Sequence, residues 1–292
     1  MLARLLGPLE IEQGGRPVAL GGRAQRALVA RLLLDAGRAV PVDRLVEDLW
    51  GEEAPPSAVK MVQIHVSALR KVLPEGVLVT RSPGYALQIV PDAVDLVRFE
   101  RLHKNGQAAL AAGSVARAVE LLREAVALWR GPALGEFDEP FAAIESARLE
   151  ELRLAAIEDR IDAELAVGDH AGLAGELEAL VARHPLRERL RGQLMLALYR
   201  SGRQAEALEG YRELRAMLTT ELGIEPSPAL RELERRVLQQ DPSLEVAKPR
   251  QPAAPVYVTA PSRRPAARPV RLCRTRGWSP MRRACTVGIR VH

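Results

Sequence analysis

Aromatic residues are scarce in this sequence, where Phe, Trp and Tyr together make up 3% of 292 residues. Hydrophobic residues nevertheless make up 47%, so a core has to be built mainly from Leu, Ala and Val. Leu and Ala favour helices, and the shortage of aromatic residues argues against a β-sandwich. We therefore expect a mainly α-helical protein with a small β component.

Cysteine is almost absent, because the two cysteines, Cys273 and Cys285, both lie near the C-terminus. No disulfide framework and no Cys-x-x-Cys pair is present, which suits a reducing cytoplasm. Long apolar runs are missing as well. The first residues, MLARLLGPLEIEQ, lack a signal-peptide core, and no run in the sequence reaches membrane-spanning length. We expect a cytoplasmic protein with no membrane partner.

Signals for catalysis, metal binding or cofactor binding are missing too. The five histidines are scattered, and none stands at metal-ligand spacing from a second ligand. Neither a P-loop nor a G-x-G-x-x-G motif occurs. The carboxylates of residues 143–165 alternate with Arg and Leu at helical spacing, which is typical of a solvated helix face. We expect no enzyme, no metal and no cofactor.

Acidic residues are absent from residues 54–74, which end in VKMVQIHVSALRKVLP, although charges are mixed freely elsewhere in residues 1–247. The formal net charge of +5 hides this local feature. Residues 248–292 contain eleven Lys and Arg and no Asp or Glu, so residues 1–247 carry about −6. A nucleic-acid site in the main body therefore has to be a local patch.

The first 90 residues alternate between short strands and helices. Residues 3–20 read as strands broken by turns, and a helix follows from about 22 to 35. Asp43 is a good N-cap for a second, short helix. The acid-free helix follows, and Ser82-Pro83-Gly84 suits a type II turn in a hairpin. This order predicts a winged helix-turn-helix, with the acid-free helix as recognition helix and the hairpin as wing.

The acid-free helix has two faces. Its expected core stripe, spaced 3, 4, 3, 4, is Val59, Val62, Val66, Leu69 and Leu73. The expected outward face is Lys60, Met61, Ile64, Ser67, Ala68 and Lys71, with Gln63 and Arg70 on one edge and His65 on the other.

DNA explains this outward face better than solvent does. A carboxylate in the major groove meets phosphates on both flanks, whereas Lys and Arg replace released counterions. The alternative is a solvated basic helix end, where cations complement the helix dipole. That alternative accounts for Arg70 and Lys71 but not for Lys60 in the first turn or for an outward Ile64. Met61 and Ile64 suit thymine methyl groups, and Gln63 suits an adenine edge.

From about residue 95 the pattern changes to long helices with a recurring glycine spacing. Gly113, Gly168 and Gly202 are each followed by small or apolar residues at +5, +9 and +12. Gly168 and Gly202 are 34 residues apart, which is the tetratricopeptide period, and a longer helix near 139–167 interrupts the array. The alternative is an ordinary helical bundle in which the spacing is accidental.

These motifs carry a resemblance. VSALRKVL (66–73) followed by VTRSPGYAL (79–87) resembles the recognition helix and wing of OmpR-type domains. AVALWRGPALGEF (125–137) and residues 220–242 look like the bacterial transcriptional activation domain. In this order they resemble the Streptomyces antibiotic regulatory protein (SARP) family of cytoplasmic activators of biosynthetic gene clusters, over about residues 1–245. The resemblance implies binding to promoter direct repeats, hence two protomers on DNA, and recruitment of RNA polymerase.

The resemblance also implies roles for individual residues. It matches groove-facing positions to Lys60, Gln63, Ile64 and Ser67, and backbone contacts to His65, Arg70 and Lys71, with Arg81 beside the wing. Two positions depart from the pattern, because Ala68 and Ala86 stand where relatives often carry a basic residue. These departures predict a lower affinity per domain or a different base preference.

We expect three segments: a DNA-binding winged helix-turn-helix (1–94), a tetratricopeptide-like activation domain (95–245) and a basic, disordered tail (246–292). The tail is either an arm that adds nonspecific DNA affinity or an unselected extension. The rival interpretation of the whole chain is a protein-interaction scaffold whose winged helix no longer binds DNA. Target genes, operator sequence and effector control are not encoded in any recognisable pattern.

Overall fold

The computed structural model describes residues 1–170 and 172–245. Its fold is mainly α-helical with a small β component, as the composition predicts. The basic tail (246–292), for which the sequence predicts disorder, lies outside the described residues.

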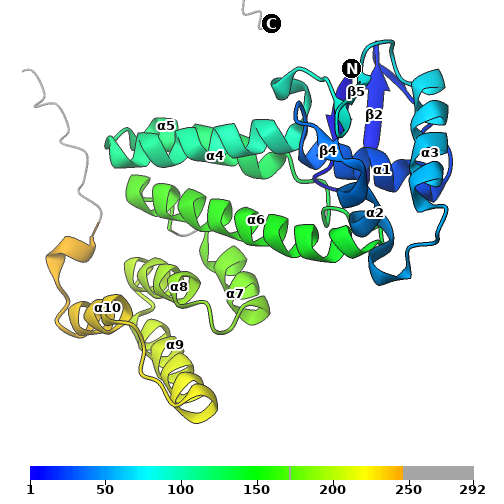
Figure 1. Ribbon diagram of the computed structural model, residues 1–292. Coiled ribbons are helices and arrows are strands. Elements are labelled where there is room, and N and C mark those ends of the chain that lie inside the picture. Colours follow the sequence, from blue (N-terminus) through cyan, green and yellow to red (C-terminus); the bar gives the residue numbers. More distant parts are fainter. Residues whose placement is uncertain (171, 246–292) are drawn as a thin grey trace, which may run out of the picture. The chain divides into compact units, whose positions relative to one another are not determined.

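Within the described residues, six short strands form two antiparallel three-stranded sheets, ordered β1–β2–β3 and β4–β6–β5 (Figure 1). The first sheet consists of β1 (Leu2–Arg4), β2 (Glu10–Gln13) and β3 (Arg16–Pro17). The second consists of β4 (Val40–Pro41), β5 (Leu78–Arg81) and β6 (Gly84–Leu87). The hairpin β5–β6 is the predicted wing.

Three helices lie between and beside these sheets and form the helix-turn-helix. They are α1 (Arg23–Leu34), α2 (Val42–Trp50) and α3 (Ala58–Val72). The 3-10 turn η1 (Gly51–Glu53) separates α2 from α3, and η2 (Pro91–Ala93) follows the wing. The order of strands and helices confirms the predicted winged helix-turn-helix.

Three local expectations are wrong. Asp43 lies inside the first turn of α2, whose N-cap is Pro41. Val59 is 44% exposed because Ala58, one turn before Val62, takes the buried position at the start of α3. The wing turn is a two-residue loop, Ser82-Pro83, with a cis peptide bond, and is not a type II turn. Gly84 belongs to β6 instead, where a Cβ atom would lie 1.8 Å from the Val40 carbonyl oxygen.

Helices α4 to α10 pack on one another along the chain: α4 with α5, α5 with α6, α7 with α8 and α8 with α9, while α6 also contacts α8, and α10 packs on α8 and α9. Their bounds are α4 (Asp95–Ala111), α5 (Val115–Ala127), α6 (Pro140–Val167), α7 (Ala174–Arg183), α8 (Glu188–Arg200) and α9 (Gln204–Met217). The chain continues through a π-helical turn, η3 (Leu218–Leu222), then α10 (Pro228–Leu238) and the 3-10 turn η4 (Pro242–Leu244).

The glycine spacing marks the turns between consecutive helices. Gly113, Gly168 and Gly202 lie between α4 and α5, α6 and α7, and α8 and α9, and have φ values of 74°, 94° and 76°. A residue with a side chain is disfavoured in this left-handed conformation. The nine residues at +5, +9 and +12 are all buried, as a repeat of paired helices requires: Ala118, Leu122, Ala125, Leu173, Leu177, Leu180, Ala207, Tyr211 and Leu214.

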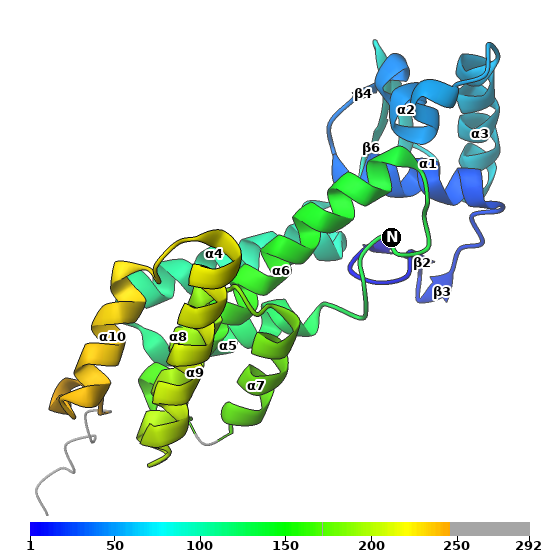
Figure 2. The ribbon, with the colours of Figure 1, turned by 90° about the horizontal axis from the view of Figure 1, so that it is seen from below.

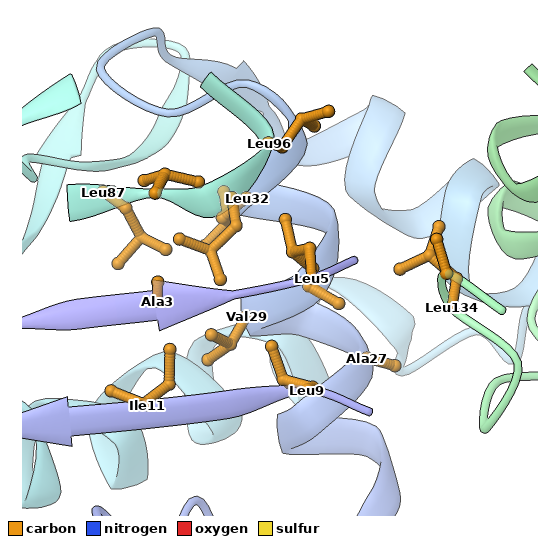
Figure 3. Close-up of a cluster of buried hydrophobic side chains, with 14 of the residues drawn as sticks. Ala3, Leu5, Leu9, Ile11, Ala27, Val29, Leu32, Leu87, Leu96 and Leu134 are labelled. Carbon is orange, nitrogen blue, oxygen red and sulfur yellow. The ribbon is translucent and has the colours of Figure 1, made fainter. Parts of the chain in front are cut away.

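One hydrophobic core connects the winged helix to the first helices of the repeat region. Figure 3 shows side chains of β1, β2, α1 and β6 meeting Leu96 of α4 and Leu134 of the loop before α6. The Asp95 carboxylate reinforces this connection because it accepts hydrogen bonds from Leu5 N–H (2.7 Å) and Leu6 N–H (3.0 Å). A second core, built by α6 to α10, follows along the chain.

Candidate nucleic-acid interface

Helix α3 is attached to the protein by one face. Val62, Val66 and Leu69 of α3, with Leu73 just beyond it, are buried in the core that α1 and α2 share. These positions recur at helical spacing, so the opposite face of α3 points away from α1 and α2. Figure 1 shows α3 at the outer side of the three-helix group, with no other helix covering it.

The outward face contains most of the residues predicted to read DNA. Lys60, Gln63, Ile64, Ser67 and Lys71 are all exposed; Lys60, Ile64, Ser67 and Lys71 recur at intervals of three or four residues, and Gln63 lies beside Ile64. Ile64 is 56% exposed although it is apolar. The structure therefore brings these five residues together in one stripe, which we call the α3 stripe.

Cations without a carboxylate partner are concentrated near this stripe. Within residues 1–94, all of which the structure describes, Arg4, Arg23, Arg26, Arg31 and Arg44 form ion pairs with Asp or Glu. The other six cations form none, and four of these belong to α3 or β5: Lys60, Arg70, Lys71 and Arg81. Unpaired cations are available to neutralise phosphates, whereas paired cations would first have to give up a partner.

His65 lies at the edge of α3 and is half-buried. Both ring nitrogens are shielded from solvent and have no hydrogen-bond partner. Burial lowers the pKa of His65 from its ordinary value of 6.5, so the neutral ring is favoured. A contact between His65 and a phosphate, as the resemblance implies, requires the ring to turn outward. This contact stays a prediction.

Arg70 differs from Lys60, Lys71 and Arg81 because its side chain donates hydrogen bonds within the protein. Its Nε donates a hydrogen bond to the Leu78 carbonyl oxygen (3.0 Å) and its Nη2 to Thr80 Oγ1 (2.7 Å). Its guanidinium carbon lies 5.9 Å from the centre of the Tyr85 ring. No local sequence pattern predicts these partners of Arg70, although cross-strand pairing of Thr80 with Tyr85 follows from the hairpin register.

The wing lies next to the start of α2. Val42 N–H at the N-terminus of α2 donates a hydrogen bond to the Pro83 carbonyl oxygen in the wing loop (3.3 Å). Arg81 is exposed at the end of β5 and pairs across the loop with Gly84. Of the two departures from the family pattern, Ala86 is fully buried and Ala68 half-buried. Ala86 therefore contributes to the core of the wing.

Other kinds of site find little support in the part of the chain that the structure describes. No group of three or more His, Cys, Asp or Glu side chains there is arranged to hold a metal ion. None of the described helices combines the length and the apolar character that a membrane crossing requires.

Comparison with known proteins identifies both halves of the molecule. Residues 15–87 match the model described as "Transcriptional regulatory protein, C terminal", and residues 94–238 match "Bacterial transcriptional activator domain". The fold and these matches define a transcriptional regulator with a winged helix followed by helical repeats.

Similar proteins come from Streptomyces and Mycobacterium. Regulatory protein DnrI of Streptomyces peucetius is 39% identical over 266 residues, which cover 87% of this chain and 98% of that protein. Regulatory protein AfsR of Streptomyces coelicolor is 48% identical over 82% of this chain but only 24% of its own length. The chain thus spans about a quarter of the AfsR relatives. It belongs to the Streptomyces antibiotic regulatory protein (SARP) family of transcriptional regulators.

A solved structure shows the same fold. The structure titled "Mycobacterium tuberculosis EmbR in complex with low affinity phosphopeptide" superposes with a TM-score of 0.79 at 39% sequence identity. The matched region covers 82% of this chain and 65% of that chain. The phosphopeptide is a ligand of that protein.

Proposed function

We propose that this protein binds promoter DNA in a sequence-specific manner in the cytoplasm and activates a biosynthetic gene cluster. The observation that supports this proposal most strongly is the α3 stripe, an exposed, acid-free helix face with unpaired Lys60 and Lys71 and an outward Ile64. Lys60 and Lys71 supply phosphate neutralisation, while Gln63, Ile64 and Ser67 face base edges. His65, Arg70 and Arg81 flank this surface.

The proposal divides the work along the chain. Residues 1–94 form the DNA-binding part, residues 95–245 the activation part that recruits RNA polymerase, and residues 246–292 an accessory tail. Two protomers, bound to adjacent direct repeats, present two activation parts to the polymerase. The membership of the family supports this division, since its relatives are named regulatory proteins.

The rival function is a protein-interaction scaffold with a winged helix that no longer binds DNA. Loss of DNA binding removes the selection against carboxylates on the outward face of α3 and for unpaired cations there. The α3 stripe keeps both properties, so we favour DNA binding.

An experiment in two stages tests the proposal. The full chain is first incubated with fragments of genomic DNA, and bound fragments are sequenced. Transcription by purified RNA polymerase is then measured on a recovered promoter. We expect enrichment of a direct repeat and transcription above the basal level.

Two charge reversals serve as variant and matched control. Lys60→Glu places a carboxylate on the α3 stripe and should abolish both enrichment and activation. Lys104→Glu makes the same change at an exposed position of α4 and should leave both unchanged. Wild-type binding by Lys60→Glu would contradict the assigned surface. Selective binding without activation would retain the DNA site and overturn the proposed recruitment of polymerase.

A further inference from the structure

Arg70 of the recognition helix α3 contacts the wing at the open edge of its sheet. β5 is an edge strand, because its sheet is ordered β4–β6–β5. The Val77 carbonyl oxygen accepts a hydrogen bond from Gln88 N–H across the hairpin. Successive carbonyls of a strand point in opposite directions, so the Leu78 carbonyl faces the open edge. Arg70 Nε reaches that carbonyl from α3.

The guanidinium group makes three contacts with the hairpin at once. Besides the Leu78 carbonyl, it binds Thr80 Oγ1 and lies over the Tyr85 ring. Thr80 and Tyr85 face each other across β5 and β6, so Arg70 touches both strands of the wing. A planar guanidinium has donors fixed in a fork, which suits a contact to two acceptors at a set distance.

The other attachments of the wing are made mainly through β6 and the wing loop. β6 pairs with β4, and the Pro83 carbonyl oxygen accepts a hydrogen bond from Val42 N–H. The outer strand, β5, pairs with β6 alone, and its Leu78 side chain packs in the shared core. The polar contacts of Arg70 add to this packing and hold the outer strand to α3. Like Arg70, Lys60, Lys71 and Arg81 form no ion pair with a described carboxylate, and these three remain available to DNA.

We propose that Arg70 is a positioning residue that fixes the wing relative to α3, so that both elements contact one operator at a set separation. This inference rests on the proposed function, that the α3 stripe reads DNA, and it departs from the phosphate contact that the family resemblance implies for Arg70. Thr80 accepts one of the hydrogen bonds of Arg70, and we call this contact between α3 and the wing the bracket.

Two substitutions, made singly and together, separate the geometry of the Arg70 contact from its charge. Arg70→Lys retains the charge and loses the fork, and Thr80→Val removes the Oγ1 acceptor without changing any charge. Both should lower affinity for the selected operator about three- to tenfold, the size expected for the net contribution of one ordinary hydrogen bond. The double variant should lose no more than the worse single variant, because both changes break one bracket.

The salt dependence of binding gives the matched control. Lys71→Gln, on the neighbouring residue, should reduce the magnitude of the salt slope by about one unit because it removes one phosphate contact. Arg70→Lys and Thr80→Val should leave that slope unchanged. Hydroxyl-radical footprints should show loss of protection at the wing side of the operator, while protection under α3 persists. A loss of fold stability alone would weaken both sides equally.

Each result decides between the alternatives. Wild-type affinity and footprint for both Thr80→Val and Arg70→Lys would overturn the bracket and make Arg70 a phosphate ligand that needs only its charge. Additive losses in the double variant would also overturn it. If the wild-type chain selects no DNA sequence, both the proposed function and the role of Arg70 fail. This outcome is distinguishable from failure of the Arg70 role alone, because it is seen with the wild-type chain before any variant is tested.

Discussion

Ile64 is the residue whose position is hardest to explain without DNA. It is more than half exposed, it lies between Lys60 and Lys71 on the α3 stripe, and it contributes little to the core. An isolated exposed apolar side chain is ordinary on a protein surface. Its neighbours make this one informative, because thymine methyl groups in the major groove are apolar and lie between phosphates.

Replacing Ile64 should therefore change recognition more than stability. Ile64→Ala should alter the free energy of unfolding by less than about 0.5 kcal/mol. It should lose about 1 kcal/mol of discrimination at one A·T pair without a change in salt slope. Thermal melts and competition binding measure the two effects.

Leu69→Ala is the matched control on the opposite face of the same helix. Leu69 is fully buried, so its replacement should cost about 2–5 kcal/mol of stability. An Ile64→Ala variant that loses stability on that scale, with its base preference intact, would show that the α3 stripe does not read DNA through Ile64.

At the scale of elements, a buried polar network connects three helices of the repeat region. Asp159 of α6 is bound by His103 and Gln107 of α4 and by Arg189 of α8, with a His103 Nε2–Asp159 Oδ2 distance of 2.7 Å. Burial opposes ionisation of Asp159, but these hydrogen bonds outweigh it and hold the pKa of the carboxyl well below its ordinary value of 3.8.

This network predicts acid sensitivity. Because the folded-state pKa is depressed, the contribution of ionised Asp159 to stability is present above the unfolded pKa of 3.8 and is lost as the pH falls below it. Asp159→Asn should lower stability at neutral pH by about 1–3 kcal/mol and flatten the decline in acid. Urea unfolding at pH 7 and below pH 4 measures both. Equal acid dependence of wild type and variant would contradict the role of Asp159.

Local patterns in the sequence predicted these elements well. They did not predict the contacts between residues that are distant in the sequence. The glycine spacing placed the turns between consecutive helices because a left-handed turn and a buried +5, +9, +12 face are local requirements. The absence of carboxylates likewise identified the outward face of α3 from the sequence. The bond from Leu5 N–H to Asp95 joins residues 90 positions apart, and no local pattern signals it. The Arg70 contacts depend on how the hairpin folds back on α3.

At the scale of the whole molecule, the winged helix and the first repeat helices share one core. The sequence predicts that residues 1–94 form the DNA-binding part, but α1 packs in the same cluster as Phe99, Leu134 and Phe141. Ion pairs add to this connection, since Arg26 of α1 binds Glu136, whose other oxygen accepts a hydrogen bond from Leu9 N–H (2.7 Å).

A fragment ending at residue 94 should therefore be less stable than the full chain. It loses the partners of the shared core and leaves Leu5 N–H and Leu6 N–H without their acceptor. Each large apolar side chain that becomes exposed costs about 1.5–3 kcal/mol, so the fragment should lose more than about 3 kcal/mol. Urea unfolding compares the two. Equal midpoints would show that the winged helix folds independently of the repeat helices.

Removal of the tail should have a different effect. Deleting residues 248–292 takes away eleven cations and leaves every described residue of the two cores in place, so the selected DNA sequence should stay the same. Nonspecific affinity should fall and the salt dependence should become shallower. Selection of bound DNA and salt titrations on the truncated chain measure this. A different preferred sequence would place specificity in the tail.

Site-specific crosslinking tests most directly the central claim that the α3 stripe lies on the bases. Cys273 and Cys285 are first replaced by Ser, and one cysteine that bears a photoreactive group is then introduced by Ser67→Cys on α3 or by Ser114→Cys before α5. Both positions are exposed serines, so they form a matched pair. We predict that the Ser67→Cys chain crosslinks to bases of the selected operator and that the Ser114→Cys chain does not. Crosslinking from position 114 but not from position 67 would contradict the account.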